Sequence, residues 1–448
     1  MNDIRPRYRR RSLFGPLLVA ATGVVILLCN LRVIKYYDAG AWFSRYWPIL
    51  LIVWGIFKLG EYLWARRHNE PYPGIGGGGV VFLVFLILSG LGASGISRVH
   101  WNIDCTDDWN DPLGFLGTRY EFNESFVQPM PVGAQVRVMS VRGDVSISAS
   151  PDDQVHVVAH KCTLNHSQEE ASQFNNSTHL KFEQQGAVWI LDMTGGSFSQ
   201  GRVDLALQVP PKYAVSVTDS RGNVHIKQIH ADVELETMRG DLDAEQINGN
   251  VSLHEHRGDV TAKNISGNVS VDGYVDDSTF ADIDGTLTLT GSYSGDVALS
   301  HVASQVKFNS SRTDLQMAKL DGDLTMDGSD LRVDAVAGPF ILRTDSKNVR
   351  LDHVTGDVRI DDPRGDIEMQ AAAPLGNVDI STTGSQISIE LPENPGFQMD
   401  AQSDGGEIQS DYSLNINNDR HNATGTVGKG GPQVKLRTNR GTIQIRKD

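Results

Sequence analysis

The sequence contains few of the residues that build disulfide frameworks or large aromatic cores. Its 448 residues include three cysteines and only 7% aromatic residues, whereas glycine occurs 45 times. A chain rich in glycine and poor in aromatic residues is typical of many short strands joined by tight turns. The composition therefore favours an all-β fold over a helical core.

The three cysteines show no C-x-x-C spacing, so a zinc site built from them is excluded. Cys29 lies in an apolar run, while Cys105 and Cys162 lie in the later, polar part of the chain. If that part is exported, Cys105 and Cys162 are candidates for a disulfide. Two free thiols are the alternative, because the sequence does not give the distance between them.

An excess of positive charge is also missing. The formal net charge is −15 and the isoelectric point is about 5.3. Nucleic acid is therefore excluded as a partner.

Motifs of catalysis and metal binding are absent as well. The chain has no G-x-S-x-G, H-E-x-x-H, P-loop or EF-hand pattern. His254 and His256 lack a third ligand for zinc, and the turns carry too few acidic residues for a calcium-binding repeat. We expect no enzyme activity, no cofactor and no metal.

Long apolar runs occur only near the start of the chain. Residues 13–31 ("LFGPLLVAATGVVILLCNL") carry no charge, and residues 47–64 and 79–96 are further apolar segments. About 20 apolar residues cross a bilayer as a helix. Residues 1–97 are therefore predicted to be a membrane region with three transmembrane helices. Whether the third segment crosses stays open.

Basic residues predict the orientation of these helices. Seven arginines flank the predicted cytoplasmic side: Arg5, Arg7, Arg9, Arg10, Arg11, Arg66 and Arg67. Four basic residues lie on the other side: Arg32, Lys35, Arg45 and Arg98. The positive-inside rule then predicts a cytoplasmic N-terminus and a C-terminal domain outside the cytoplasm.

A repeat fills much of the remaining chain. A turn residue, Asp or Asn, and then apolar-x-apolar recur every nine residues, as in the segments that begin at Gly240, Gly249 and Gly258. Alternating apolar residues indicate a strand with one buried face, and glycine provides the positive φ that a corner needs.

An aliphatic residue before every second turn doubles the period to about 18 residues. These positions are Ile229, Ile247, Ile265, Ile283, Val302, Leu320, Val336 and Val354. We call this the aliphatic corner. The pattern predicts a parallel β-solenoid with two strands per coil. We expect a linker at 98–130, then a solenoid at 131–448 with an N-terminal cap at 131–215, repeats at 216–390 and a C-terminal cap at 391–448.

The opposite corner carries basic residues, and we call it the arginine corner. Its members form a predicted basic ridge: Arg221, Arg239, Arg257, Arg312, Lys347 and Arg364. Arg-Gly-Asp occurs four times, three of them in the turns at Arg239, Arg257 and Arg364, where an arginine position meets a Gly-Asp turn. The ridge is either a solvated edge that relieves repulsion between aspartates or a docking strip for an anionic envelope polymer or partner.

The segments "MPVGAQVRVMSVRGDVSIS", "LALQVPPKYAVSVTDSRGNVHI" and "GTVGKGGPQVKLRTNRGTIQI" resemble the Toastrack family of bacterial β-strand-repeat proteins. These proteins are often labelled adhesin candidates, and the resemblance covers about residues 120–448. Residues 12–63 are similar to the two-helix membrane region of LiaI/LiaF-type envelope-stress proteins. Together the resemblances imply a protein of the bacterial cytoplasmic (inner) membrane, with a place in envelope stress sensing and no catalytic residues to carry over.

The sequence thus favours a non-enzymatic, membrane-anchored scaffold whose partners are the membrane, an envelope polymer or other membrane proteins. A cell-surface adhesin is the alternative. A β-helix enzyme that acts on polysaccharides is a third hypothesis, although clustered carboxylates on one outer face are not evident.

Overall fold

The computed structural model describes residues 118–448, apart from residues 132–133, 141, 166, 195–200 and 393–395. It also describes some helical residues between 49 and 67. The chain divides into two units, and the larger one comprises residues 121–162, 173–198 and 202–448. Within the described residues, no helix is both long and apolar enough to cross a membrane. Predicted spans 13–31 and 79–96 lie outside these residues, and span 47–64 is described only in part.

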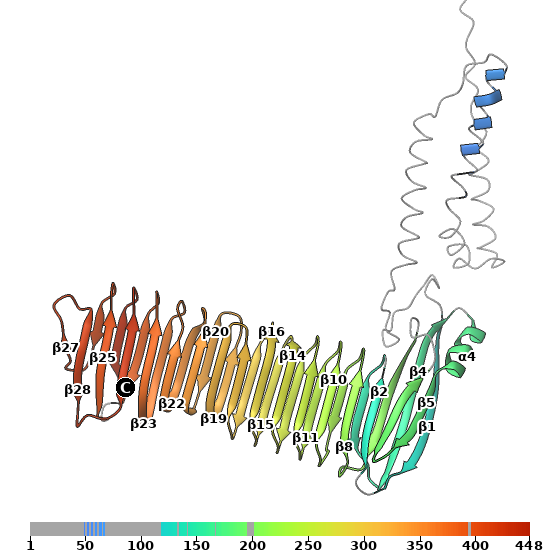
Figure 1. Ribbon diagram of the computed structural model, residues 1–448, viewed down its shortest axis with the longest axis horizontal. Coiled ribbons are helices and arrows are strands. Elements are labelled where there is room, and N and C mark those ends of the chain that lie inside the picture. Colours follow the sequence, from blue (N-terminus) through green and yellow to red (C-terminus); the bar gives the residue numbers. More distant parts are fainter. Residues whose placement is uncertain are drawn as a thin grey trace, which may run out of the picture. The chain divides into compact units, whose positions relative to one another are not determined.

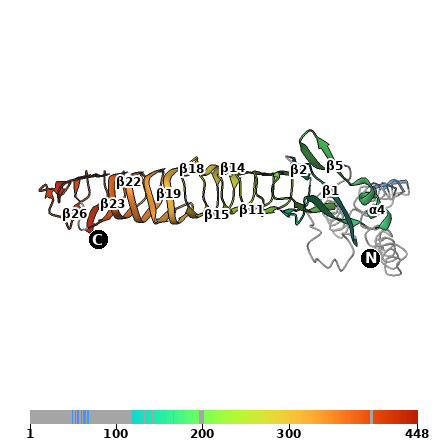
Figure 2. The same cartoon turned by 90° about the horizontal axis from the view of Figure 1, so that it is seen from below.

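The regular part of the larger unit consists of two facing sheets of short strands (Figures 1 and 2). One sheet contains β8 (Ala214–Asp219), β10 (Val233–Thr237), β12 (Val251–Glu255), β14 (Val269–Val275), β16 (Leu287–Tyr293) and β18 (Val306–Ser310). The other contains β9 (Val224–Lys227), β11 (Leu242–Ile247), β13 (Val260–Ile265), β15 (Ser278–Ile283) and β17 (Val297–Val302).

These strands pair in parallel with the predicted period. Val233 pairs with Val251, and Val251 pairs with Val269, so each step is 18 residues. Inward side chains form continuous columns, in which Leu235 and Leu253 are fully buried. Burying an aliphatic side chain of this kind contributes about 1.5–3 kcal/mol. The prediction of an all-β solenoid with two strands per coil is confirmed.

One coil runs in the opposite direction, which corrects the expectation of parallel repeats throughout 216–390. Strand β19 (Thr313–Met326) is antiparallel to β17 and β18, and also to β20 (Asp330–Asp334) and β21 (Val336–Thr344). Parallel pairing resumes with β22 (Asn348–Asp361) and β23 (Ile367–Thr382).

Local hydrogen bonds explain the two reversals. At the first, the Ser310 hydroxyl accepts a hydrogen bond from the Thr313 amide at 3.2 Å. At the second, Asp327 Oδ1 accepts from the amides of Ser329 at 2.6 Å and Asp330 at 2.7 Å. Such side-chain bonds to nearby amides are typical of tight turns.

The first and last coils of the solenoid are interleaved with their neighbours. At the start, β2 (Gln135–Ser140) lies between β6 (Val188–Thr194) and β8, and β3 (Val145–Ala149) lies between β7 (Gly201–Val209) and β9. At the other end, β29 (Gln433–Thr438) lies between β23 and β25 (Phe397–Ser403). Likewise β30 (Ile443–Lys447) lies between β24 (Ile387–Leu391) and β26 (Ile408–Ser410).

Additional strands close the N-terminal end of the stack. They are β1 (Thr118–Pro129), β4 (Gln154–Asn165) and β5 (His179–Gln185). Phe182 packs between Phe126 and Trp189, with ring centroids 5.9 and 5.1 Å away. Residues 118–129 form the strand β1, in which alternate side chains are half-buried. The predicted linker at 98–130 therefore ends earlier than expected.

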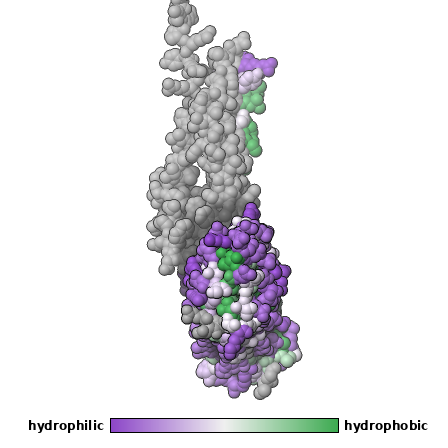
Figure 3. Space-filling view, turned by 90° about the vertical axis from the view of Figure 1, so that its left-hand side faces the viewer, coloured by the Kyte–Doolittle hydropathy of each residue, from purple (hydrophilic) through white to green (hydrophobic). Residues whose placement is uncertain are grey.

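At the C-terminal end, β28 (Asn422–Val427) pairs with β25 and with β27 (Asn415–Ile416). Tyr412 packs edge-on against Phe397 at 5.1 Å, and its hydroxyl donates to the Leu391 carbonyl at 2.9 Å. Viewed onto this end, apolar residues gather in the middle of the face and polar residues surround them (Figure 3).

A short helix, α4 (Gln168–Ser177), interrupts the strands near the start of the described chain. The Ser167 hydroxyl accepts a hydrogen bond from the Glu170 amide at 3.2 Å, which is a typical N-terminal cap. The helix lies within the predicted N-terminal cap at 131–215.

Candidate functional site: the arginine corner

The two corners of each coil close by different means. At the aliphatic corner, the buried residue follows a residue in the left-handed region, such as Gln246 with φ 57° before Ile247 and Asn264 with φ 57° before Ile265. Glycine was expected to supply this conformation. Gly249 is instead needed for space, because a Cβ there would lie 2.4 Å from the backbone of Ala231.

At Arg221, Arg239 and Arg257, the arginine corner begins with a buried polar residue two positions before the arginine. Thr237 Oγ1 accepts a hydrogen bond from the Arg239 amide at 3.2 Å, and Glu255 Oε1 accepts from the Arg257 amide at 2.6 Å. Asp219 Oδ1 accepts from the Arg221 amide at 3.3 Å. Sequence reasoning missed these residues, although a polar residue at an inward strand position was a usable signal.

Burial raises the pKa of both carboxyl groups among these residues. Removal from water raises the pKa of Glu255 to about 8 and that of Asp219 to about 6, since desolvation disfavours the charged form. Both residues are only 1% exposed. Within the described part of the chain, Glu255 Oε2 has no hydrogen-bond partner. The interior of this corner therefore contains groups that titrate near neutral pH.

Glycine follows Arg221, Arg239 and Arg257 because the neighbouring coil leaves no room for a side chain. A Cβ at Gly222 would lie 2.0 Å from the Gly143 carbonyl oxygen, and one at Gly240 would lie 2.1 Å from the Gly222 oxygen. Both residues also have positive φ, at 152° and 139°.

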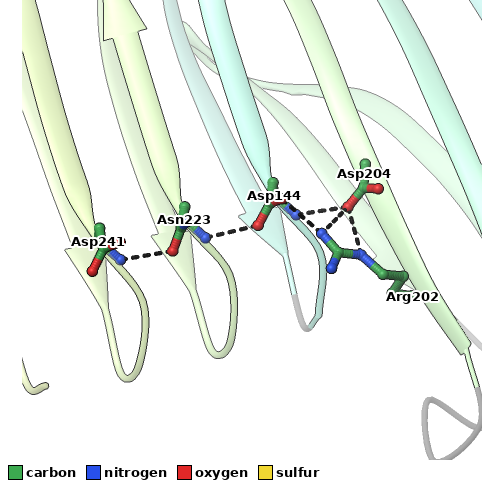
Figure 4. A network of polar contacts seen from close by, with 5 residues as sticks. All are labelled: Asp144, Arg202, Asp204, Asn223 and Asp241. Atoms are coloured by element: carbon green, nitrogen blue, oxygen red, sulfur yellow. Dashed lines mark hydrogen bonds and ion pairs between the residues drawn. The ribbon is translucent and has the colours of Figure 1, made fainter. Parts of the chain in front are cut away.

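The residue after the glycine belongs to a hydrogen-bonded ladder (Figure 4). The Asn223 amide donates to Asp144 Oδ1 at 3.0 Å, and the Asp241 amide donates to Asn223 Oδ1 at 2.9 Å. The ladder continues in the same way through Asp259, Asp277 and Asp296. Each side chain thus fixes the backbone of the next coil.

A buried arginine anchors the N-terminal end of this ladder. Arg202 is 6% exposed, and its Nη2 lies 2.8 Å from Asp144 Oδ2 and 2.5 Å from Asp204 Oδ1. The Asp144 amide also donates to Asp204 Oδ1 at 2.9 Å. Arg202 therefore has a structural role.

Three residues of the predicted basic ridge stack on successive coils. The carbonyl of Arg239 accepts from the Gly222 amide at 3.0 Å, and that of Arg257 accepts from the Gly240 amide at 3.1 Å. The carbonyl of Arg221 accepts from the Gly143 amide at 2.9 Å, which places Arg142 next in the row. Arg221, Arg239 and Arg257 are exposed. Arg142 was not included in the predicted ridge.

The other three residues do not continue this row. Arg312 lies at the first reversal, before β19. Lys347 is only 8% exposed, and its ammonium group donates to the Asp327 carbonyl, so it does not belong to an exposed ridge. Arg364 occupies a later turn, where its Nε donates to the Asp345 carbonyl at 3.2 Å.

The predicted disulfide is described only at one end. Cys162 is 1% exposed and disulfide-bonded. Cys105 lies outside the described residues, so its pairing with Cys162 stays a prediction.

A hollow on the outer face of β19, β20, β22 and β23 contains carboxylates, but arginines accompany them. Arg350 bonds to Asp352 at 3.0 Å and to Glu368 at 3.2 Å. Among the residues that the structure describes, no three His, Cys, Asp or Glu side chains are grouped to hold a metal ion.

The sequence matches the Toastrack DUF4097 family over residues 135–446. The chain belongs to this family. The Toastrack region thus spans the interleaved first coil, the regular and reversed coils, and the interleaved last coil. No curated protein matches the chain.

Several solved structures resemble this Toastrack chain. A candidate cell adhesion protein from Clostridium sporogenes is 12% identical, with 73% of this chain and 100% of that chain covered and a TM-score of 0.17. A candidate adhesin from Parabacteroides merdae is 11% identical, with 73% and 97% covered and a TM-score of 0.21. A candidate lipid-binding protein from Parabacteroides distasonis is 12% identical, with 73% and 96% covered and a TM-score of 0.19.

Proposed function

We propose that this Toastrack chain is a non-enzymatic, membrane-anchored protein of the bacterial envelope whose solenoid is an extracytoplasmic interaction scaffold. The observation that carries the proposal is the continuous stack of coils. Its 18-residue register, buried columns and side-chain ladder make each coil support the next. Repeat stacks of this kind form elongated surfaces suited to binding partners.

The membrane part of the proposal is supported by the apolar runs at 13–31, 47–64 and 79–96 and by the excess of arginines around the predicted cytoplasmic side. The resemblance of residues 12–63 to LiaI/LiaF-type proteins supports a place in envelope stress sensing. In this arrangement, the solenoid binds an envelope component or a membrane protein, and the helices pass the signal on or hold the protein in place.

Protease access to the full-length protein tests the proposed location. Protease is added to intact cells, to spheroplasts and to inverted membrane vesicles, and the C-terminal domain is followed by a tag at residue 448. We expect cleavage in spheroplasts only. Cleavage in inverted vesicles would overturn the orientation, and cleavage in intact cells would support the alternative function, a cell-surface adhesin.

A further inference from the structure

The arginine corner carries two parallel rows of side chains, one of arginines and one of aspartates and asparagine. Arg221, Arg239 and Arg257 form one row. Asn223, Asp241 and Asp259, each two residues later in the same turn, form the other. All six residues are exposed. Successive coils lie about 4.8 Å apart, so both rows have the same spacing.

The fold does not require arginine at these positions. Ser294 occupies the equivalent position before Gly295-Asp296, and Gly384 occupies it two residues before Gln386. The backbone hydrogen bonds of the turn are formed by the main chain and by the buried polar residue, and none of them needs the guanidinium group.

The aspartate ladder does not require arginine either. It continues past Arg257 to Asp277 and Asp296, where the arginine position holds Val275 and Ser294. Relief of repulsion between stacked carboxylates therefore does not explain why arginines occur together on neighbouring coils.

We propose that this edge binds the same edge of a second copy of the chain, with the two solenoids parallel. A two-fold axis along the solenoid direction places the arginine row of one copy opposite the Asp/Asn row of the other at every coil. An antiparallel pair would place like charges opposite each other. Such a self-complementary patch is what a two-fold interface requires.

The acidic row also decides against a linear polyanion as the occupant. A polyanion attracted by Arg239 and Arg257 would meet Asp241 and Asp259 on the same turns, and the chain as a whole carries a net charge of −15. A second copy presents both signs at the same spacing. The inference rests on the proposed scaffold function, under which a shared membrane keeps both copies parallel and raises their effective concentration.

Cross-linking of the full-length protein in its membrane tests the geometry. Ser220 is exposed and precedes Arg221 in the turn, so it lies outside the arginine row, and the two copies of Ser220 flank the proposed axis without touching. We expect Ser220→Cys to give a dimer linked by a thiol-reactive bismaleimide, whose spacer bridges the two thiols. Ser266→Cys, at the exposed opposite corner, is the matched control and gives the background of the unmodified protein. Equal cross-linking at both positions would overturn the proposal.

Charge variants in the Ser220→Cys background test the chemistry. Arg239→Ser with Arg257→Ser lowers the cross-linked fraction about tenfold, because each loss counts twice in a symmetric pair. Asp241→Asn with Asp259→Asn lowers it similarly, while Asn keeps the ladder acceptor, as Asn223 already does. Arg312→Ser with Arg364→Ser is the control and leaves it unchanged.

The aspartate variants separate the second copy from a polyanion. If the edge binds a polyanion, Asp241→Asn with Asp259→Asn strengthens binding of inorganic polyphosphate and leaves the cross-link unchanged, and that result would overturn self-association. A C-terminal domain found in the cytoplasm would instead overturn the proposed location, while the cross-link between copies would remain.

Discussion

The aliphatic corner and the arginine corner perform the same geometric task with different chemistry. At the aliphatic corner, Ile247 and Ile265 are buried against the core and a left-handed residue precedes each of them. At the arginine corner, Thr237 and Glu255 are buried and accept amide hydrogen bonds from the turn. One corner is held by packing, and the other is held by internal polar groups.

This difference shows which positions of the sequence are constrained. At the aliphatic corner the constraint falls on the side chain that fills the core. At the arginine corner it falls on the buried acceptor and on the glycine, while the guanidinium groups of Arg239 and Arg257 take no part in the turn hydrogen bonds. Substitutions at the two corners should therefore differ in size and in pH dependence.

The largest effect is expected at the arginine-corner glycine. Gly240→Ala places a Cβ about 2 Å from a backbone oxygen at positive φ and should lower the free energy of unfolding by about 4 kcal/mol. Urea denaturation of the full-length protein, followed by circular dichroism, measures this. Gly384→Ala is the control, since a Cβ there meets nothing within 4 Å. Equal losses in both variants would contradict the steric explanation.

At the aliphatic corner, Ile247→Ala should cost about 3 kcal/mol, because it removes a fully buried side chain and leaves a cavity. The same denaturation experiment applies. Hydrogen exchange should show the loss of protection in the neighbouring coils, because coils in a repeat stack support one another. If Ile247→Ala lowered hydrogen-exchange protection only at the arginine corner, the expectation that Ile247 stabilises its own corner and the neighbouring coils would be contradicted.

The buried carboxyl group of Glu255 should make the stability of the arginine corner depend on pH. Folding raises the pKa of Glu255 from 4.5 to about 8. The contribution of its protonated carboxyl group to the free energy of unfolding is therefore fully present below pH 4.5 and is lost as the pH rises through about 8. Glu255→Gln should remove this loss and stabilise the protein by about 2 kcal/mol at pH 9. Stability is measured by denaturation from pH 4 to 9. An unchanged pH slope would refute the role of Glu255.

The smallest effect is expected at the arginine itself. Arg239→Ser should change the free energy of unfolding by no more than about 0.5 kcal/mol, because the side chain is exposed and the turn bonds are made by other groups. A loss comparable with that of Ile247→Ala would mean that the arginine is part of the framework and would remove the reason to assign it a binding role.

The sequence was sufficient to predict the coil because Val233, Val251 and Val269 repeat at the period of the stacked strands. It could not show the reversed coil. The apolar-x-apolar pattern is the same in both directions and does not show which way a strand runs. Leu320 therefore fits the 18-residue spacing after Val302 even though the strand direction changes. The interleaved strands at the two ends were also missed, since the pattern of a strand does not show which strands lie on either side of it.

The candidate site was predicted in part. Spacing placed Arg221, Arg239 and Arg257 in one row, because equivalent turn positions stack. It did not reveal that Lys347 is buried, since the carbonyl of Asp327 that accepts its hydrogen bond comes from the irregular turn after the reversed coil. The buried acceptors were missed because their polarity suggested solvent exposure.

The interleaved ends govern how this protein is built and how its length can change. The pair β29 and β30 is synthesised after β25 and β26, yet it occupies the layer between β23–β24 and β25–β26. That end cannot be completed until β30 has been synthesised. An extra coil copied into the middle keeps both closures intact, whereas one inserted directly after β30 finds its neighbouring layers already taken. Such a protein lengthens from within.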